Sequence, residues 1–329
     1  MYFKRKIDEF LFRWKQDPAH KPLIIKGARQ IGKTESILHF ANEQYTNIIY
    51  INFVLEKKYS MIVNDGYDVE TVLKNISLID PSKKFVPGET IIIFDEIQEC
   101  PRARMALKFF KLDGRYDVIC TGSLLGVSGY RDQSISVPVG YETMITMYPL
   151  DFEEFLWANG ISEQIIDKLQ YGLDTVSPIS DVIHTKMNDL MHKYVIVGGM
   201  PAVVNEFIET KQLNKVLQLQ RDIVNGYRDD MIKYASSRNK SQIRECFDSI
   251  PKQLAKENKK FQYSLVKKKG TAAMFSGSLQ WIEDAGIVRK CYNLQMPELP
   301  LAGNAIDNVF KVYMADTGLF VSMLEDGTQ

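Results

Sequence analysis

Cysteine and histidine are scarce in this sequence of 329 residues, which has four of each. The cysteines are far apart and form no C-x-x-C pair, and the histidines show no spacing typical of metal ligands. These absences argue against a disulfide framework and against a zinc site. They predict instead that the cysteines are buried thiols in a reducing compartment.

The sequence also lacks a long apolar run and an excess of charge of one sign. No stretch reaches the roughly 18 uninterrupted apolar residues that a membrane-spanning helix requires, and the charged N-terminus does not resemble a signal peptide. Lys and Arg total 41, as do Asp and Glu, so the whole chain carries no evident charge for binding nucleic acid or a membrane surface. We therefore expect a cytoplasmic protein.

No internal repeat or low-complexity tract is present, and 45% of the residues are apolar. A chain of this length and composition can bury sizeable cores and is expected to form two or three domains. Its patterns divide it into residues 1–150, 151–239 and 240–329.

The most informative segment is GARQIGKT at 27–34, a full match to G-x-x-x-x-G-K-[ST]. An apolar run precedes it and a helical pattern comes after it, so strand, loop and helix stand in the order that a phosphate-binding loop requires. Loop amides can bind phosphates, the lysine can reach the outer phosphates, and the threonine hydroxyl can bind Mg²⁺. The residues predicted to bind nucleotide here are Gly27, Gln30, Ile31, Gly32, Lys33, Thr34 and Glu35.

A second polar pair ends the apolar run of TIIIFDEIQE at 90–99. We predict that Asp95 binds Mg²⁺ and that Glu96 orients and deprotonates a water that attacks the γ-phosphate. The alternative is an ordinary buried strand that ends in a solvated acidic turn.

Ser123 comes directly after another short apolar run, YDVICTG. A hydroxyl at this place can contact the γ-phosphate or the attacking water, which would give Ser123 a catalytic role together with Lys33 and Glu96. A serine that merely caps the next segment explains the same pattern equally well.

The first 150 residues contain strand candidates separated by helical patterns, which predicts an α/β fold with a parallel sheet flanked by helices. The candidates are residues 23–26, 47–53, 91–95, 117–122 and 143–148. If the 117–122 strand lies between the strand of Asp95 and the strand that leads into the loop, the core has the order of additional-strand P-loop NTPases.

Several segments together resemble the AAA-type ATP-binding proteins of bacteria and archaea that carry a C-terminal domain of unknown function and are related to STAND signalling ATPases. The segments are GARQIGKT, IIIFDEIQ, CTGSLL, MYPLDFEEFLW, VGGMPAVV and FKVYMADTGLF. The resemblance implies ATP or ADP and Mg²⁺ as ligands, with the roles given above for Lys33, Asp95, Glu96 and Ser123. It also implies that Pro201 lines the nucleotide pocket.

Two departures from that family pattern are visible. Many members have an arginine before the last core strand, whereas this sequence has Tyr141 there, and Arg131 is the nearest substitute. Many members also continue into a restriction-nuclease-like domain. This sequence ends soon after DTGLF without such a segment, which predicts that the nuclease-like part is truncated.

Residues 151–239 have helical spacing, broken at Gly198, Gly199 and Pro201, and we expect a helical lid. Residues 240–329 show two helical stripes, then strands expected at 287–294 and 309–315 with a loop between them, a pattern typical of a winged helix. Between 240 and 290 there are eleven Lys or Arg and five Asp or Glu. A basic patch at Lys267, Lys268 and Lys269 could contact DNA, although such lysines often serve only solubility.

Together these patterns predict a Mg²⁺-dependent ATPase whose nucleotide state moves the lid and the winged-helix unit. One alternative is a nucleotide-dependent switch or scaffold that does not hydrolyse ATP. A further alternative is a DNA-processing ATPase, and an unknown protein partner would fit any of the three.

Overall fold

The computed structural model describes residues 1–123, 140–234 and 240–324. The chain separates into two compact units, Met1–Tyr148 and Pro149–Gln329. The predicted further boundary at 239/240 adjoins residues 235–239, which lie outside the described residues, and it stays a prediction.

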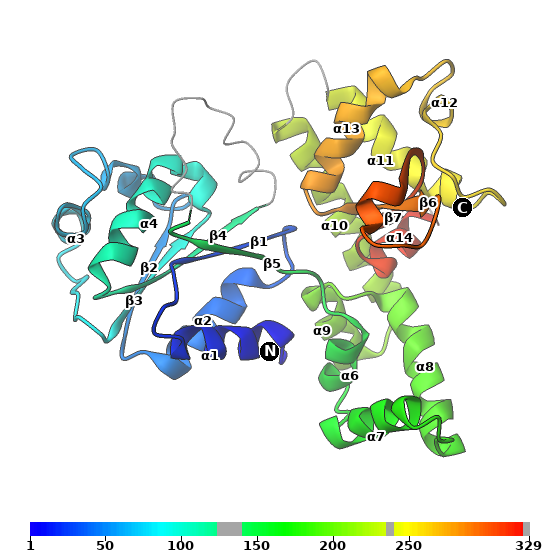
Figure 1. Ribbon diagram of the computed structural model, residues 1–329, viewed down its shortest axis with the longest axis horizontal. Helices are drawn as coiled ribbons and strands as arrows, with labels where there is room; N and C mark the ends of the chain where they lie inside the picture. The colour runs from blue at the N-terminus through cyan, green and yellow to red at the C-terminus, as the bar shows by residue number, and fades with distance from the viewer. Residues whose placement is uncertain (124–139, 235–239, 325–329) are drawn as a thin grey trace. The chain divides into compact units, whose positions relative to one another are not determined.

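The first unit is built on a five-stranded parallel sheet in the order β2-β3-β4-β1-β5 (Figure 1). Its strands are β1 (Leu23–Gly27), β2 (Asn47–Asn52), β3 (Thr90–Asp95), β4 (Asp117–Ser123) and β5 (Thr143–Thr146). Because β4 lies between β3 and β1, the predicted additional-strand order is confirmed.

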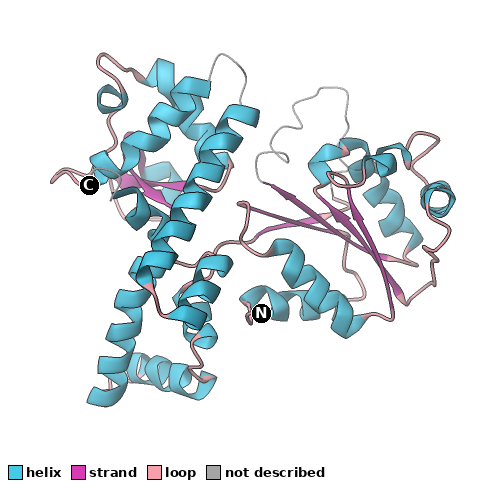
Figure 2. Cartoon of the chain, turned by 180° about the vertical axis from the view of Figure 1, so that it is seen from behind, coloured by secondary structure: helices cyan, strands magenta, loops and turns pink. Residues whose placement is uncertain are grey.

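Helices cover both faces of this sheet, as Figures 1 and 2 show from opposite sides. Helices α1 (Lys6–Gln16) and α2 (Lys33–Gln44) cover one face, and α3 (Val69–Ile79) and α4 (Pro101–Asp113) cover the other. Short 3-10 turns η1 (Lys57–Met61) and η2 (Ile97–Glu99) precede α3 and α4 in the chain. The core on the α3 and α4 side takes alternate residues of the strands, among them Ile51, Phe94 and Cys120. Side chains one position along each strand therefore face α2.

Over its described residues, the second unit consists of helices and one antiparallel hairpin. Its elements are α6 (Phe152–Ala158), α7 (Glu163–Asp174), α8 (Asp181–Val197), α9 (Pro201–Thr210), α10 (Leu213–Tyr234), α11 (Lys240–Leu254), α12 (Tyr263–Val266), α13 (Ala272–Asp284), β6 (Val288–Leu294), η3 (Leu301–Asn304), β7 (Ala305–Met314) and α14 (Thr317–Leu324). The sequence predicted a loop through residue 308, but β7 already begins at Ala305, which pairs with Leu294. Pairing on both sides of Asp307 and Asn308 extends β7 through these two residues of low strand propensity, where the register is irregular.

Local sequence signals explain how the second unit begins. The Asp151 carboxylate accepts the N–H of Glu154 at 3.0 Å and caps α6. Pro201 occupies the first turn of α9, where its missing N–H leaves no hydrogen bond unmade.

Two glycines before Pro201 allow a close approach of backbone to a buried carboxylate. A Cβ on Gly199 would stand 1.9 Å from the carbonyl oxygen of Leu150, and a Cβ on Gly198 would stand 2.3 Å from Asp316 Oδ1. Asp316 Oδ2 accepts the N–H of Gly199 at 2.6 Å, and its Oδ1 accepts the N–H of Leu319 at 2.9 Å. Asp316 thus joins the start of α14 to the loop that enters α9.

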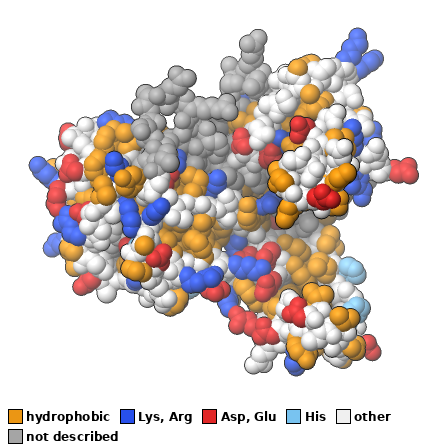
Figure 3. All heavy atoms as spheres, in the orientation of Figure 1, with side chains coloured by type: hydrophobic (Ala, Val, Ile, Leu, Met, Phe, Trp, Pro, Cys, Tyr) orange, Lys and Arg blue, Asp and Glu red, His pale blue; other side chains and the backbone are white. Residues whose placement is uncertain are grey.

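Within the described residues, no helix is both long and apolar enough to cross a lipid bilayer. On the face drawn in Figure 3, positive and negative side chains are interspersed. This agrees with the equal totals of basic and acidic residues in the sequence.

Candidate nucleotide-binding site

The loop between β1 and α2 has the backbone conformation that its glycines permit. Gly32 has a φ of 88° and Gln30 has a φ of 65°, so both residues lie in the left-handed region. At Gly27 a Cβ would stand 2.5 Å from both Ile31 Cδ1 and the carbonyl oxygen of Met147. A side chain at Gly27 would therefore push against the loop and against the backbone just after β5.

Lys33 is the first residue of α2 and is only 8% exposed. Its Nζ donates to the carbonyl oxygens of Gly27 at 3.1 Å and Ala28 at 2.8 Å. Burial lowers the pKa of Lys33 to about 8, although the charges of Glu96 and Asp95 act in the opposite direction. A phosphate at the loop would favour the charged ammonium, so this lysine is suited to bind one.

Asp95, at the end of β3, is 3% exposed and accepts hydrogen bonds from four side chains. The donors are Thr34 Oγ1 at 3.3 Å to each oxygen, Asn52 Nδ2 at 2.9 Å, Tyr50 OH at 2.5 Å and Thr121 Oγ1. A carboxylate buried without partners would cost several kcal/mol, so these donors offset the cost of burying Asp95 at this depth. The hydroxyl of Thr34 is thereby held beside an acidic oxygen.

Strand register explains why these side chains converge. Asn52 lies opposite Asp95 in the β2–β3 pairing, and the register of Phe94 with Cys120 places Thr121 next to Asp95. Tyr50 is two positions before Asn52 and therefore projects from the same face. All of them lie on the α2 side, where the first turn of that helix supplies Thr34.

Glu96 comes directly after Asp95 in a left-handed backbone conformation, with φ 56° and ψ 50°. This conformation costs a non-glycine residue about 1 kcal/mol. The Glu96 N–H offsets part of that cost by donating to Asp95 Oδ1 at 3.1 Å and lying 3.3 Å from Thr121 Oγ1. Gln98 Nε2 donates to Glu96 Oε2 and so limits the carboxylate's rotation. Backbone strain of this kind is typical of functional sites.

For the other predicted site residues that are described, the structure gives the position in the fold but no contact that defines a role. Ser123 ends β4 with its backbone opposite Gly27, and Glu35 lies exposed in the first turn of α2. Ile31 is fully buried. Pro201 belongs to the second unit, and its part in the nucleotide pocket stays a prediction. Arg131 lies outside the described residues.

Sequence reasoning missed several residues that build this site. Tyr50, Asn52 and Thr121 all donate hydrogen bonds to Asp95. Only the strand register, which the sequence does not show, could have identified them. Arg5 is buried and donates to the carbonyl oxygens of Ile31 at 3.0 Å and Tyr148 at 2.7 Å. Its position in a charged N-terminal cluster gave no sign of this contact with the loop.

Family comparison agrees with this geometry. Residues 19–156 match the family model described as an AAA domain, and residues 188–329 match a domain of unknown function (DUF8612). The chain carries an AAA domain. This confirms the resemblance inferred from the motifs, including the C-terminal domain of unknown function, and an AAA domain implies nucleotide binding. No curated protein matches the sequence.

Several solved structures are similar to this chain over most of its length. The Walker-type ATPase of Pyrococcus abyssi is 13% identical with a TM-score of 0.56, and the match covers 98% of this chain and 96% of that one. At this identity the likeness shows the fold alone. The ORC2 protein of Aeropyrum pernix is 12% identical with a TM-score of 0.44, and the match covers 99% of this chain and 94% of that one. The RuvB Holliday junction branch migration motor of Thermotoga maritima is 13% identical with a TM-score of 0.40, and the match covers 88% of this chain and 90% of that one.

Proposed function

We propose that this protein is an ATPase that binds ATP with Mg²⁺ in its AAA domain, hydrolyses it, and thereby moves the second unit. The observation that carries the proposal is the arrangement around Asp95, where the first turn of the loop helix and the ends of three strands meet. A phosphate-binding loop beside a buried carboxylate, with a second acid directly after it, is the arrangement that ATP hydrolysis requires.

The residues present fit a magnesium ion. Mg²⁺ prefers oxygen ligands and retains several waters, and Thr34 Oγ1 and the Asp95 carboxylate offer oxygens 3.3 Å apart. Thr34 and Asp95 would hold the ion, directly or through its waters. When bound, Mg²⁺ would neutralise charge on the β- and γ-phosphates.

The chain's own residues have distinct parts in this proposal. Lys33 exchanges its carbonyl contacts for phosphate oxygens and takes up their negative charge. Glu96, fixed by its backbone and by Gln98, accepts a proton from the water that attacks the γ-phosphate in line. Ser123 contacts the γ-phosphate or that water. Asn52 and Thr121 keep Asp95 in one orientation and so act as positioning residues.

Adenine is the base we propose, because a guanine-reading N-K-x-D segment is missing from the sequence. Residues 151–239 would act as a lid over the nucleotide, with Pro201 lining the pocket, and residues 240–329 as a winged-helix unit that moves with the lid. Tyr141 stands where many AAA-type relatives have an arginine. Because a tyrosine cannot take up charge on the transferring phosphate, we expect turnover by the chain alone to be slow.

Replacing Glu96 by Gln tests the proposal against the rival of a switch that does not hydrolyse ATP. An ATPase should retain ATP affinity within about threefold and lose turnover by 100-fold or more, because general-base catalysis contributes about 10²–10⁴. A switch should show no difference between the two proteins, since neither would release phosphate.

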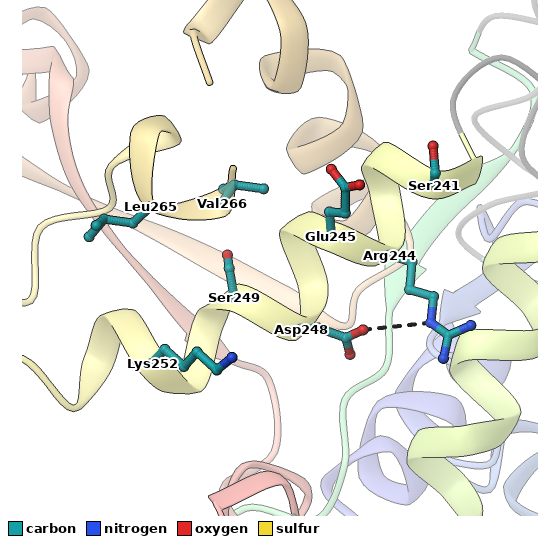
Figure 4. Close-up of a pocket in the computed structure, with 8 residues that line it drawn as sticks. All are labelled: Ser241, Arg244, Glu245, Asp248, Ser249, Lys252, Leu265 and Val266. Atoms are coloured by element: carbon teal, nitrogen blue, oxygen red, sulfur yellow. Dashed lines mark ion pairs between the residues drawn. The ribbon is translucent and has the colours of Figure 1, made fainter. Parts of the chain in front are cut away.

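DNA binding through Lys267, Lys268 and Lys269 is a separate proposal. All three lysines are exposed, which supports it, but Lys267 Nζ is paired with Glu245 Oε1 at 3.0 Å. The pocket beside this pair mixes both signs of charge, with Arg244 directed at Asp248 (Figure 4). Neutralising the three lysines should lower salt-sensitive DNA affinity, and unchanged binding would exclude the patch.

A further inference from the structure

The β6–β7 hairpin borders a groove that the ATPase proposal does not use, and we call it the hairpin groove. Its volume is about 400 Å³, close to the 430 Å³ of the α11 pocket drawn in Figure 4. Its lining comes from both strands and from the segment after α11: Asn258, Lys260, Cys291, Tyr292, Asn293, Val309, Phe310, Lys311 and Tyr313.

Strand register explains how the main face of the groove is composed. Cys291 lies opposite Lys311, and Tyr313 is two positions further along β7, so all three project from one face. Val312 alternates with them and is buried on the other face. The segment after α11 lies along β7, since the N–H of Phe261 donates to the carbonyl oxygen of Phe310 at 2.8 Å. The residue before Phe261, Lys260, thereby reaches the lining of the groove.

Two tyrosines that line the groove are partly exposed to solvent. Tyr292 is 41% exposed and Tyr313 is 40% exposed. The Tyr292 ring packs on Phe310 with centroids 5.5 Å apart, and Phe310 stacks on Phe261 at 5.8 Å. These rings lie on the face opposite to Lys311 and Tyr313, because Tyr292 and Phe310 form the next pair in the register. Tyr313 is therefore the ring on the main face that is open to a stacked base.

The charge of the groove has one sign. Lys260 and Lys311 both line it and are exposed or half-buried, and among the described lining residues none is Asp or Glu. The α11 pocket is different, because Arg244 and Lys252 share it with Glu245 and Asp248. An anionic ligand therefore meets both attraction and repulsion at the α11 pocket, whereas the charged residues that line the hairpin groove only attract it.

We propose that the hairpin groove binds a single-stranded nucleic acid. Lysines that track a phosphate backbone and aromatic rings on which bases stack are the combination that such proteins use, whatever the base sequence. Asn258 and Asn293 supply amide donors and acceptors for base edges. An acidic peptide would satisfy the two lysines but would leave the exposed ring of Tyr313 without a partner. A duplex keeps its bases stacked inside and gains nothing from the rings.

This inference stands apart from ATP hydrolysis and from the patch at Lys267–Lys269. The test uses the full chain with fluorescent oligo-dT and oligo-U of about 20 nucleotides, the matching duplex, and poly-glutamate as competitor. The variants are Lys260→Gln with Lys311→Gln, and Tyr313→Ala. The matched control is Lys186→Gln with Lys215→Gln, two exposed lysines outside the groove and outside that patch, which removes the same charge from the same unit. Circular dichroism of each variant checks that it is folded.

We expect wild type to bind the single strand more tightly than the duplex, with affinity that falls as salt rises. The double lysine variant of the groove should lose about tenfold or more and reduce the log–log salt slope by about 1.4, because each single-strand phosphate contact contributes about 0.7. Tyr313→Ala should lose about tenfold, from one unstacked base. The control should bind like wild type, and bound oligonucleotide should slow alkylation of the exposed Cys291.

Any of three results overturns the proposal: no single-strand binding by wild type, an equal loss in the control, or a Tyr313→Ala variant that binds normally. Poly-glutamate that protects Cys291 when the oligonucleotide does not would show instead that the groove takes an acidic protein.

Discussion

Asn52 and Asp95 lie opposite each other in the register of β2 and β3, and the Asn52 side-chain amide donates to Asp95 Oδ2 at 2.9 Å. Asn52 Oδ1 in turn accepts the N–H groups of Val54 and Leu55, each at 3.0 Å. The turn after β2 therefore fixes the amide, and the amide fixes one oxygen of the carboxylate. Asp95 is oriented by residues that need not contact nucleotide or metal themselves.

Asn52→Ala is expected to weaken Mg²⁺-dependent retention of ATP by about 10- to 100-fold, the usual effect of losing a partner that orients a metal ligand. Titrating Mg²⁺ against bound fluorescent ATP measures it. Asn47→Ala is the matched control. Asn47 begins the same strand, at the end away from Asp95, and its side-chain amide donates to the Lys84 carbonyl oxygen and to Thr90 Oγ1. Equal Mg²⁺ dependence in the two variants would show that Asn52 has no part in orienting Asp95.

Nucleotide affinity should fall as pH rises above about 8, where Lys33 loses its proton. Bound phosphate stabilises the ammonium and raises the pKa of Lys33, so binding takes up a proton in that range and weakens by up to about tenfold per pH unit. Phosphate itself is already ionised there, since its second pKa is about 6. Measuring the Kd between pH 6.5 and 9.5 checks this, with Lys33→Arg as the control that stays charged. A wild-type profile as flat as that of the arginine variant would contradict it.

The same shift has a defined effect on stability. The pKa of Lys33 in the folded protein, about 8, lies below its value of 10.5 in an unfolded chain. The unfolded state therefore binds more protons between these values, and the contribution of Lys33 to the free energy of unfolding rises with pH across that window. Nucleotide binding and stability of the free protein should consequently change in opposite directions above pH 8.

Gly27→Ala should cost about 1–3 kcal/mol of stability and at least tenfold in ATP affinity, because the added methyl meets the Met147 carbonyl oxygen at 2.5 Å. Thermal unfolding with and without ATP measures both effects. Gly226→Ala in α10 is the control: its Cβ would have no described heavy atom within 4 Å, and alanine favours a helix by up to about 1 kcal/mol. If the two variants unfold at the same temperature, the close approach at Gly27 is not a constraint.

Asp316→Asn should loosen the contact between the loop before α9 and the start of α14. An amide nitrogen would then face one of the two N–H donors, from Gly199 or Leu319, at a cost of about 1–3 kcal/mol. Hydrogen exchange should become faster in residues 198–201 and 317–324. Asp307→Asn, an exposed position on β7, should change nothing there. Unchanged exchange in the Asp316 variant would exclude it as the joining residue.

The sequence predicted the sheet well because each strand of the first unit is a short apolar run, and several of these runs end in a polar motif. IIIFDE, for example, marks both β3 and its functional end. The strand order could be stated only conditionally, since no local pattern says which strands pair. The same limit hid Thr121, Tyr50 and Asn52: spacing favoured the terminal hydroxyl of Ser123, whereas register brings Thr121 to Asp95.

The second unit was predicted less closely for a related reason. Asp307 and Asn308 are residues typical of loops, yet β7 continues through them, between the pair of Ala305 with Leu294 and the pair of Phe310 with Tyr292. The sequence pattern does not distinguish Lys267 from Lys268 and Lys269. In the structure Lys267 forms an ion pair with Glu245, which is far from it in sequence. Contacts of this kind depend on tertiary structure and leave no mark in a local pattern.

The most direct test of the central claim is phosphate release from ATP and Mg²⁺ by wild type, Lys33→Ala and Glu96→Gln, with ATP binding measured in parallel. We expect slow turnover by wild type, loss of binding and turnover in Lys33→Ala, and retained binding without turnover in Glu96→Gln. Wild-type protein that binds ATP but releases phosphate no faster than Glu96→Gln would contradict the assignment of an ATPase.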